Sequence, residues 1–319
     1  MWPFKKRQEA APDAPEFCSY LGDPEAERLE AALLKKDWET SRAILTAAAP
    51  EERSYYVGIA ADTAGVEEWI NGPIRDEPGS TLPLLIRGAR LVYWAWEARG
   101  EGGSSTVSEN AWKVWFQRLR QAEDCLDEVV ERNPADAEAW EYLITLGRAR
   151  QLPTEERWRR FNRLIEADPT HYYGHTQMLE GLMRKWSGSA EEMFDFARTR
   201  AAACPGTHIP VLVALAHIEH GRGNGGTDLH QYLQQDDVVD DIWNASQLSA
   251  FHDDYKETLL TPYVWNNFAF TLGLGGQYNA AGSLFDVMGE DWITRSPWNT
   301  TTNYLKVRDH VQSNRDDQD

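Results

Sequence analysis

Three prolines that recur at nearly equal intervals constrain the fold of this 319-residue chain most strongly. Pro134, Pro169 and Pro205 stand 35 and 36 residues apart. Matching positions in each interval are apolar: Leu126, Phe161 and Ala197 lie eight residues before the prolines, and Leu143, Met178 and Ala214 lie nine after them. A period of this length indicates stacked helix–turn–helix units. Each proline is expected to end one helix and to lie in the first turn of the next, where a missing N–H is tolerated.

The segment 261–288, with the sequence TPYVWNNFAFTLGLGGQYNAAGSLFDVM, is the clearest of these units. Large side chains recur in it at helical spacing, small residues stand between them, and a glycine pair marks a turn near its middle. The pattern predicts two antiparallel helices that approach closely because large groups fill the space over small ones. The residues expected to pack the helix pairs are Trp140, Leu143, Phe161, Trp265, Phe268, Gly276, Tyr278, Ala281 and Phe285.

Apolar periodicity predicts helices through most of the remaining chain, and no alternating apolar pattern is long enough to predict a sheet. Asp23 with the proline after it opens the first helix. Thr154 and Ser189 are expected to cap later helices, the second together with Glu192 as a capping box. The apolar stretch 81–98 contains two arginines, so it predicts a buried helix rather than a membrane span.

These signals predict one long helical domain between two tails. The expected divisions are a disordered tail at 1–20, a single helical-repeat domain at 21–310 and an acidic disordered tail at 311–319. Within the domain we expect degenerate repeats at 21–222, an acidic insertion at 223–258, the best-matching repeat at 262–290 and a capping helix at 302–311.

The formal net charge is −19, from 32 Lys and Arg against 51 Asp and Glu. Non-specific nucleic-acid binding requires a net basic face, so nucleic acid is not an expected partner. Three cysteines without a C-x-x-C pair favour the reducing cytoplasm over a disulfide framework or a cysteine zinc site. The first 17 residues have no apolar stretch after their basic residues, which does not match a secretory signal.

The repeats resemble the tetratricopeptide-repeat (TPR) superfamily. The segment 261–288 is similar to the pattern W-x2-L-G-x2-Y…G-x-Y-x2-A-x3-F, with Phe268, Ala269 and Leu272 in the L, G and Y positions. The segments WAWEARG, KWSGSAEEMFDFAR and ALAHIEH are also similar to those of TPR-like actinobacterial proteins of no known activity. The resemblance implies an all-α, right-handed α-α superhelix of about five or six helix pairs. It also implies a non-catalytic scaffold that holds a peptide or a partner helix in a concave groove.

Polar side chains at the groove positions of this family are the expected partner-binding residues. Asn266 and Asn267 follow Trp265 in the last repeat, and Tyr142 and Gln177 stand at equivalent positions in earlier repeats. An amide suits peptide recognition because it offers a hydrogen-bond donor and an acceptor together. The basic residues that clamp a C-terminal carboxylate in some TPR proteins are missing here, so we expect a partner that is not acidic-tailed and is basic or neutral.

Two histidine pairs offer the alternative of a metal-dependent protein or enzyme. His171 and His175 are four residues apart, and His217 and His220 are three apart, so each pair can share one helix face. Their registers relative to the repeat prolines differ by about 9 Å of helix rise, too far for all four rings to bind one ion. No metal or other cofactor is therefore expected.

The remaining motifs give no enzyme class. No nucleotide-binding loop or nucleophile elbow is present. The aspartate pairs at 236–237, 240–241 and 253–254 lack the spacing of a calcium-binding loop. They predict a solvated acidic face or a docking patch for a basic partner. A membrane-surface adaptor tethered by Trp2, Phe4 and the basic residues 5–7 is a second alternative, although no long amphipathic helix follows them. The expected function is a cytoplasmic, non-catalytic interaction scaffold.

Overall fold

The computed structural model describes residues 15–100, 107–223 and 228–315, and within these ranges every regular element is a helix. The predicted all-α class is therefore confirmed for the described residues. None of their helices is long and apolar enough to cross a membrane. Of the tails predicted at 1–20 and 311–319, residues 1–14 and 316–319 lie outside these ranges. Residues 311–314 belong to the last helix, Thr301–Asn314, so the second tail was predicted to begin too early.

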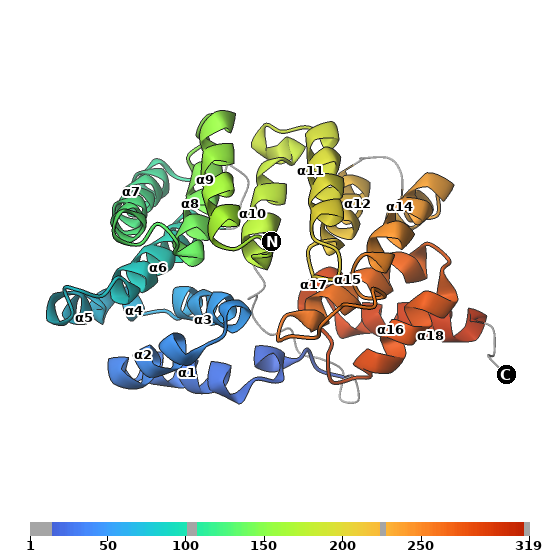
Figure 1. The fold of residues 1–319 in the computed structure, drawn as a ribbon, viewed down its shortest axis with the longest axis horizontal. Helices are drawn as coiled ribbons and strands as arrows, with labels where there is room; N and C mark the ends of the chain where they lie inside the picture. The colour runs from blue at the N-terminus through green and yellow to red at the C-terminus, as the bar shows by residue number, and fades with distance from the viewer. Residues whose placement is uncertain (1–14, 101–106, 224–227, 316–319) are drawn as a thin grey trace. The chain divides into compact units, whose positions relative to one another are not determined.

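The chain forms two compact units, one from Asp23 to Gly181 and the other from the segment before Asp23 together with the residues from Leu182 onward. The boundary at 181–182 falls inside the stretch for which one domain was predicted. The first unit contains α1 Pro24–Leu34, α2 Trp38–Ala47, α3 Pro50–Asp62, α4 Val66–Trp69, α5 Asn71–Asp76, α6 Leu82–Arg99, α7 Glu109–Arg132, α8 Ala137–Ala149, α9 Thr154–Ala167 and α10 Tyr172–Gly181. Helices that follow one another in the chain pack side by side, as α6 with α7 and α8 with α9 (Figure 1).

The repeat prolines mark the ends of helices as predicted, but they stand outside the next helix. α7, α9 and α11 (Ala190–Ala203) each end two residues before their proline, at Pro134, Pro169 and Pro205. The next helices begin three to six residues after those prolines. A turn therefore separates the two helices, and the expectation that each proline lies in a first helical turn was wrong.

The helix α6 is buried, as its composition predicted. The positive charge of its Arg90 is paired with carboxylates inside the same unit. Arg90 is fully buried and donates hydrogen bonds to Glu67, to Glu97 and to the carbonyl of Ala61. A buried guanidinium is tolerated when carboxylates and a carbonyl satisfy its N–H groups.

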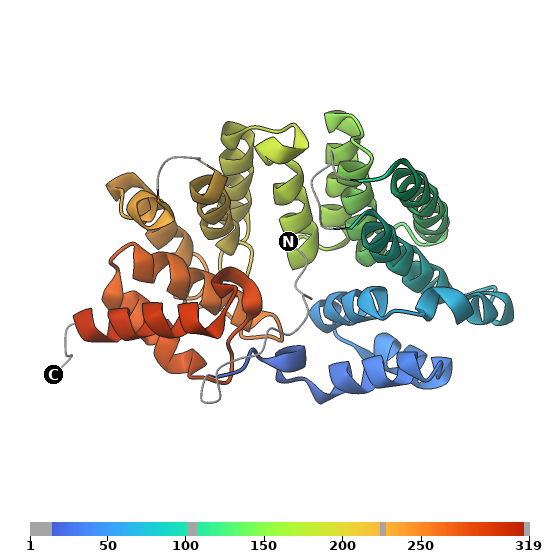
Figure 2. The same ribbon diagram turned by 180° about the vertical axis from the view of Figure 1, so that it is seen from behind.

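The second unit contains α11 Ala190–Ala203, α12 Val211–Gly223, α13 Leu229–Leu233, α14 Asp236–Gln247, α15 Thr261–Leu274, α16 Tyr278–Met288, α17 Arg295–Trp298 and α18 Thr301–Asn314. The acidic stretch predicted as an insertion forms α13 and α14, and α14 packs against both α12 and α15. The helix pair predicted at 261–288 is present as α15 and α16, with α18 against both of them (Figure 2). Gly276 turns the chain with a φ of 80°, which a residue with a side chain rarely adopts.

Most of the predicted packing residues lie in the cores of the units. Seven of the nine are buried: Trp140, Leu143, Phe161, Trp265, Phe268, Ala281 and Phe285. Gly276 is exposed in the turn before α16, so its prediction as a packing residue was wrong. Tyr278 is half-buried and its ring packs edge-on against His310 of α18. The small-and-large spacing therefore predicted the interior contacts well.

The two predicted helix caps differ in outcome. Ser189 precedes α11, and its hydroxyl accepts a hydrogen bond from the N–H of Glu192, as predicted. Thr154 is instead the first residue of α9, which Pro153 precedes. Its hydroxyl accepts a hydrogen bond from Arg157 one turn later. The start of α9 was therefore misplaced by one residue.

Candidate functional site

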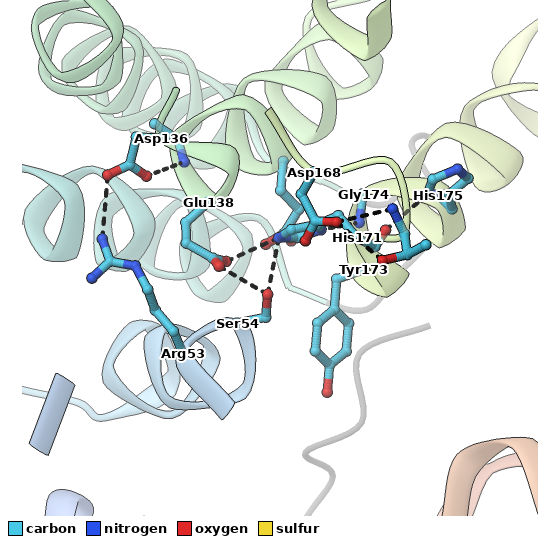
Figure 3. Close-up of polar contacts among 12 residues, drawn as sticks. Arg53, Ser54, Asp136, Glu138, Asp168, His171, Tyr173, Gly174 and His175 are labelled. Atoms are coloured by element: carbon cyan, nitrogen blue, oxygen red, sulfur yellow. Dashed lines mark hydrogen bonds and ion pairs between the residues drawn. The ribbon is translucent and has the colours of Figure 1, made fainter. Parts of the chain in front are cut away.

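The first unit holds a buried polar cluster where α3, α8 and α10 meet (Figure 3). Ser54 of α3 donates a hydrogen bond to Glu138 of α8 at 2.9 Å. The Nε2 atom of His171 lies 2.9 Å from the Ser54 hydroxyl and 3.2 Å from the Glu138 carboxylate. Three segments that are far apart in the sequence are thus joined by one hydrogen-bonded set.

Local helix-capping chemistry places these side chains. Asp136 precedes α8, accepts a hydrogen bond from the N–H of Ala139 and binds Arg53 of α3. Glu138 lies in the first turn of α8, where the helix dipole favours a negative charge. The N–H of Gly174 donates to Nδ1 of His171 at 3.0 Å and so satisfies an amide at the start of α10.

The hydrogen bonds define the protonation of the His171 ring. Because Nδ1 accepts from Gly174, the proton of the neutral ring is on Nε2, which faces Ser54 and Glu138. Burial would lower the pKa of His171, but the Glu138 carboxylate outweighs burial and raises this pKa to about 9. The Gly174 N–H opposes that rise, since protonation would remove the lone pair that it binds.

A metal ion does not fit this cluster as it is arranged. Glu138, Glu141 and His171 are the one set of three possible metal ligands within the described ranges, with ligand atoms within 4.8 Å of one another. A histidine that binds a metal through one nitrogen normally donates a hydrogen bond from the other. Here binding through Nε2 would put a proton on Nδ1, directly against the Gly174 N–H. Metal binding would therefore require the first turn of α10 to rearrange.

The cluster also differs from a serine nucleophile with its base. In such a site the histidine accepts the serine proton at one nitrogen and donates to a carboxylate from the other. His171 instead presents the same nitrogen to Ser54 and to Glu138, while its second nitrogen is bound to a backbone amide. The hydroxyl of Ser54 donates its hydrogen bond to Glu138 rather than to His171, and Ser54 is buried. The arrangement holds three helices together and does not activate Ser54.

Replacing Glu141 with Gln is expected to raise the free energy of unfolding, and this gain should grow between about pH 5 and about pH 8. Burial raises the pKa of the Glu141 carboxyl from 4.5 to about 8. In that range the unfolded chain releases the proton while the folded chain keeps it, so the wild-type protein loses stability as the pH rises. The gain should approach about 5 kcal/mol near pH 8, because the folded and unfolded pKa values differ by about 3.5.

Urea denaturation at several pH values measures this effect, with Glu131→Gln on the exposed surface of α7 as the matched control. The control should show no pH-dependent gain. A difference between Glu141→Gln and wild type that does not change with pH would show that Glu141 is already ionised in the folded protein.

The other predicted histidines take part in helix packing. His175 is buried, its Nδ1 donates to the carbonyl of His171, and its ring meets Phe161 edge-on. His217 lies between the Tyr232 hydroxyl at 2.7 Å and the Asp241 carboxylate at 2.9 Å. His175 and His217 therefore both take part in contacts inside the units.

His220 packs against the aromatic rings of Phe194 and Tyr232. Burial lowers the pKa of His220. This environment favours the neutral ring and, like that of the other three histidines, is accounted for by contacts between helices.

The predicted partner-binding residues are mostly inside the units, which corrects their expected position on a groove. Asn266 is fully buried: its Nδ2 donates to the carbonyls of Pro262 and Trp292, and its Oδ1 accepts from Thr294 N–H and Trp298 Nε1. These four bonds use the full capacity of an amide, so Asn266 joins α15 to the chain around α17.

The other three residues differ in their exposure. Asn267 is buried and its Nδ2 donates to the carbonyl of Tyr263. Tyr142 is buried, which raises the pKa of its hydroxyl. Gln177 is half-buried and accepts a hydrogen bond from Thr145. Of the four predicted partner-binding side chains, Gln177 alone keeps a partly exposed surface.

The sequence did not indicate the most exposed aromatic side chain of the described residues. Phe116 of α7 is 50% exposed and stacks on Trp112, with ring centroids 5.9 Å apart. The guanidinium of Arg99, at the end of α6, lies over the rings of Trp96 and Trp112 at 5.3 and 5.4 Å. We call these four residues, Trp96, Arg99, Trp112 and Phe116, the aromatic edge. The pattern W-x2-W-F in α7 was visible in the sequence, but it did not show which ring would lie outside.

Comparisons with known proteins do not identify a family. No protein-family model matches the chain, and no significant match exists among curated proteins.

Proposed function

We propose that this protein is a non-catalytic interaction scaffold that binds a peptide or a helix of a partner protein, and that its helix pairs belong to a right-handed TPR-like superhelix. The observation that carries the proposal is the aromatic edge. Trp, Phe and Arg are enriched at protein interfaces and dominate binding energy there. An exposed Phe that is stacked on Trp and flanked by Arg is costly to leave in water unless a partner covers it.

The buried chemistry of the chain supports a scaffold over an enzyme. The carboxylates and histidines of the cluster at α3, α8 and α10 are engaged with one another and with backbone amides. His217 and Asp241 in the second unit are engaged with Tyr232 and Arg198. Polar groups used in this way stabilise contacts between helices.

A cytoplasmic location is part of the proposal. Cys18 and Cys125 form no disulfide, and burial is the main cause of the raised pKa of both thiols. Unpaired, unreactive thiols are compatible with a reducing compartment.

Affinity purification from the native cell tests the proposal, with Phe116→Ser as the variant and Trp243→Ser as the control. Trp243 is another exposed aromatic residue, at 37%, and lies in the other unit. We expect wild type and Trp243→Ser to retain the same partner, and Phe116→Ser to lose most of it while keeping its circular dichroism spectrum. A partner set that is unchanged by Phe116→Ser would refute the assignment of this surface.

A further inference from the structure

We propose that the aromatic edge binds an acidic amphipathic helix of the partner, which lies along the part of α7 that α8 does not cover. The inference rests on the proposed scaffold function and goes further by naming the partner's chemistry and shape. It replaces the basic or neutral partner expected from the net charge of −19, because the charge beside the aromatic edge is positive. Its support is the mismatch in length between α7 and α8, the exposed rings on the uncovered part and the sign of the charge around them.

The mismatch in length is large. α7 has 24 residues and α8, which packs against it, has 13. At about 1.5 Å per residue, α7 extends past α8 by roughly 16 Å. The ion pair between Arg150, directly after α8, and Glu123 shows where α8 ends, about halfway along α7. The turns of α7 before Glu123 therefore have no α8 beside them.

The uncovered turns of α7 carry an apolar stripe. Trp112, Phe116 and Arg120 are spaced by four residues, so they follow one edge of the helix. Trp115 lies beside this edge, is buried and meets both Trp96 and Phe116 edge-on. Within the described residues, α6 thus packs beneath the stripe, and Phe116 stays 50% exposed beyond the end of α8.

The charge around the stripe selects an acidic partner. Residues 109–121 of α7 contain three basic side chains and one acidic side chain, whereas residues 122–132 contain five acidic and one basic. The single acidic group of the first half, Glu109, is already paired with Lys113. Arg99 and Arg120 flank the exposed rings. Lys113 is taken up by Glu109, and Arg118 donates to the carbonyl of Trp94 and lies over its ring. Arg99 and Arg120 therefore carry the positive charge beside the rings, and complementary charge steers and selects partners.

The shape of the gap favours a helix as the occupant. The missing neighbour of α7 amounts to about three helical turns, from the difference between the two helix lengths. A partner helix with Leu or Phe on one face and Glu on the other can place its apolar face on Trp112 and Phe116. Its acidic face then reaches Arg99 and Arg120, which an uncharged or basic helix cannot pair with.

Fluorescence anisotropy with two helix-stabilised synthetic peptides of about 12 residues tests the inference, because unconstrained helices of this length are marginal in water. Both peptides carry Leu and Phe on one face, and the other face carries Glu in the first peptide and Lys in the second. The full-length protein is compared with Phe116→Ser and Arg120→Glu. Trp243→Ser and Arg75→Glu are the matched controls, since each changes an exposed residue away from the aromatic edge.

The Glu peptide should bind wild type and both controls, and each test variant should weaken it by about tenfold or more. The Lys peptide should bind at least about tenfold more weakly than the Glu peptide. Equal or tighter binding of the Lys peptide, or no binding of the Glu peptide, would overturn this inference. Both of those results would leave the proposed function in place if purification of the native partner still depends on Phe116.

Discussion

Replacing Glu138 with Ala will destabilise the protein by about 3–5 kcal/mol, the range for removal of one partner from a buried charged pair. Glu138 accepts hydrogen bonds from Ser54 and His171, which belong to two other helices. Without the carboxylate, the Nε2–H of His171 loses its charged acceptor and the pKa of His171 loses its main source of elevation. Urea denaturation at neutral pH measures the loss.

Two comparisons separate this account from a metal site. Glu138→Gln keeps one acceptor oxygen, so it should lose less stability than Glu138→Ala. A metal that binds the folded state raises its melting temperature. Since we expect no metal at this cluster, Zn²⁺ or a chelator should leave the melting temperature of the wild-type protein unchanged. A rise in melting temperature with Zn²⁺ that Glu138→Ala abolishes would show that the cluster does bind a metal.

Replacing Trp298 with Ala will destabilise the second unit by about 3–5 kcal/mol through the cavity left behind. Trp298 is 1% exposed, and its ring meets Phe270 and Tyr304 edge-on at 5.2 Å from each. Its Nε1 also donates to Oδ1 of Asn266 at 2.6 Å. The substitution therefore removes aromatic packing and one of the four hydrogen bonds that hold Asn266.

Trp298→Phe separates the two contributions, because it keeps an aromatic ring and removes the N–H donor. We expect a loss of about 1–3 kcal/mol for that variant. Trp243→Ala, which changes an exposed Trp, should be within about 0.5 kcal/mol of wild type. If Trp298→Ala were as mild as Trp243→Ala, the ring would not be part of a packed core, and the structure around α17 would be wrong.

The sequence predicted contacts that depend on local spacing. The pair α15 and α16 followed from the order of large and small residues, and the helix ends near Pro134, Pro169 and Pro205 followed from the period. The burial of Trp265, Phe268 and Phe285 followed from the same spacing. Each of these features depends on residues within one or two neighbouring helices. They can therefore be predicted from the spacing of residues in one sequence.

Features that join distant segments were not predictable in the same way. Ser54 and His171 meet across 117 positions, and nothing in the local pattern of either residue indicates the other. Asn266 was expected on a surface because its family position faces a groove, yet the segment after α16 returns to cover it. Phe116 was overlooked because its exposure depends on where α8 ends, which only the packed structure shows.

Hydrogen–deuterium exchange of the protein with and without its purified partner tests the central claim most directly. The account predicts that the partner slows exchange in residues 109–120 of α7 and around Arg99, and leaves the buried helices α8 and α15 unchanged. Slower exchange confined to α8, α10 or α15, with no change along the first turns of α7, would contradict it.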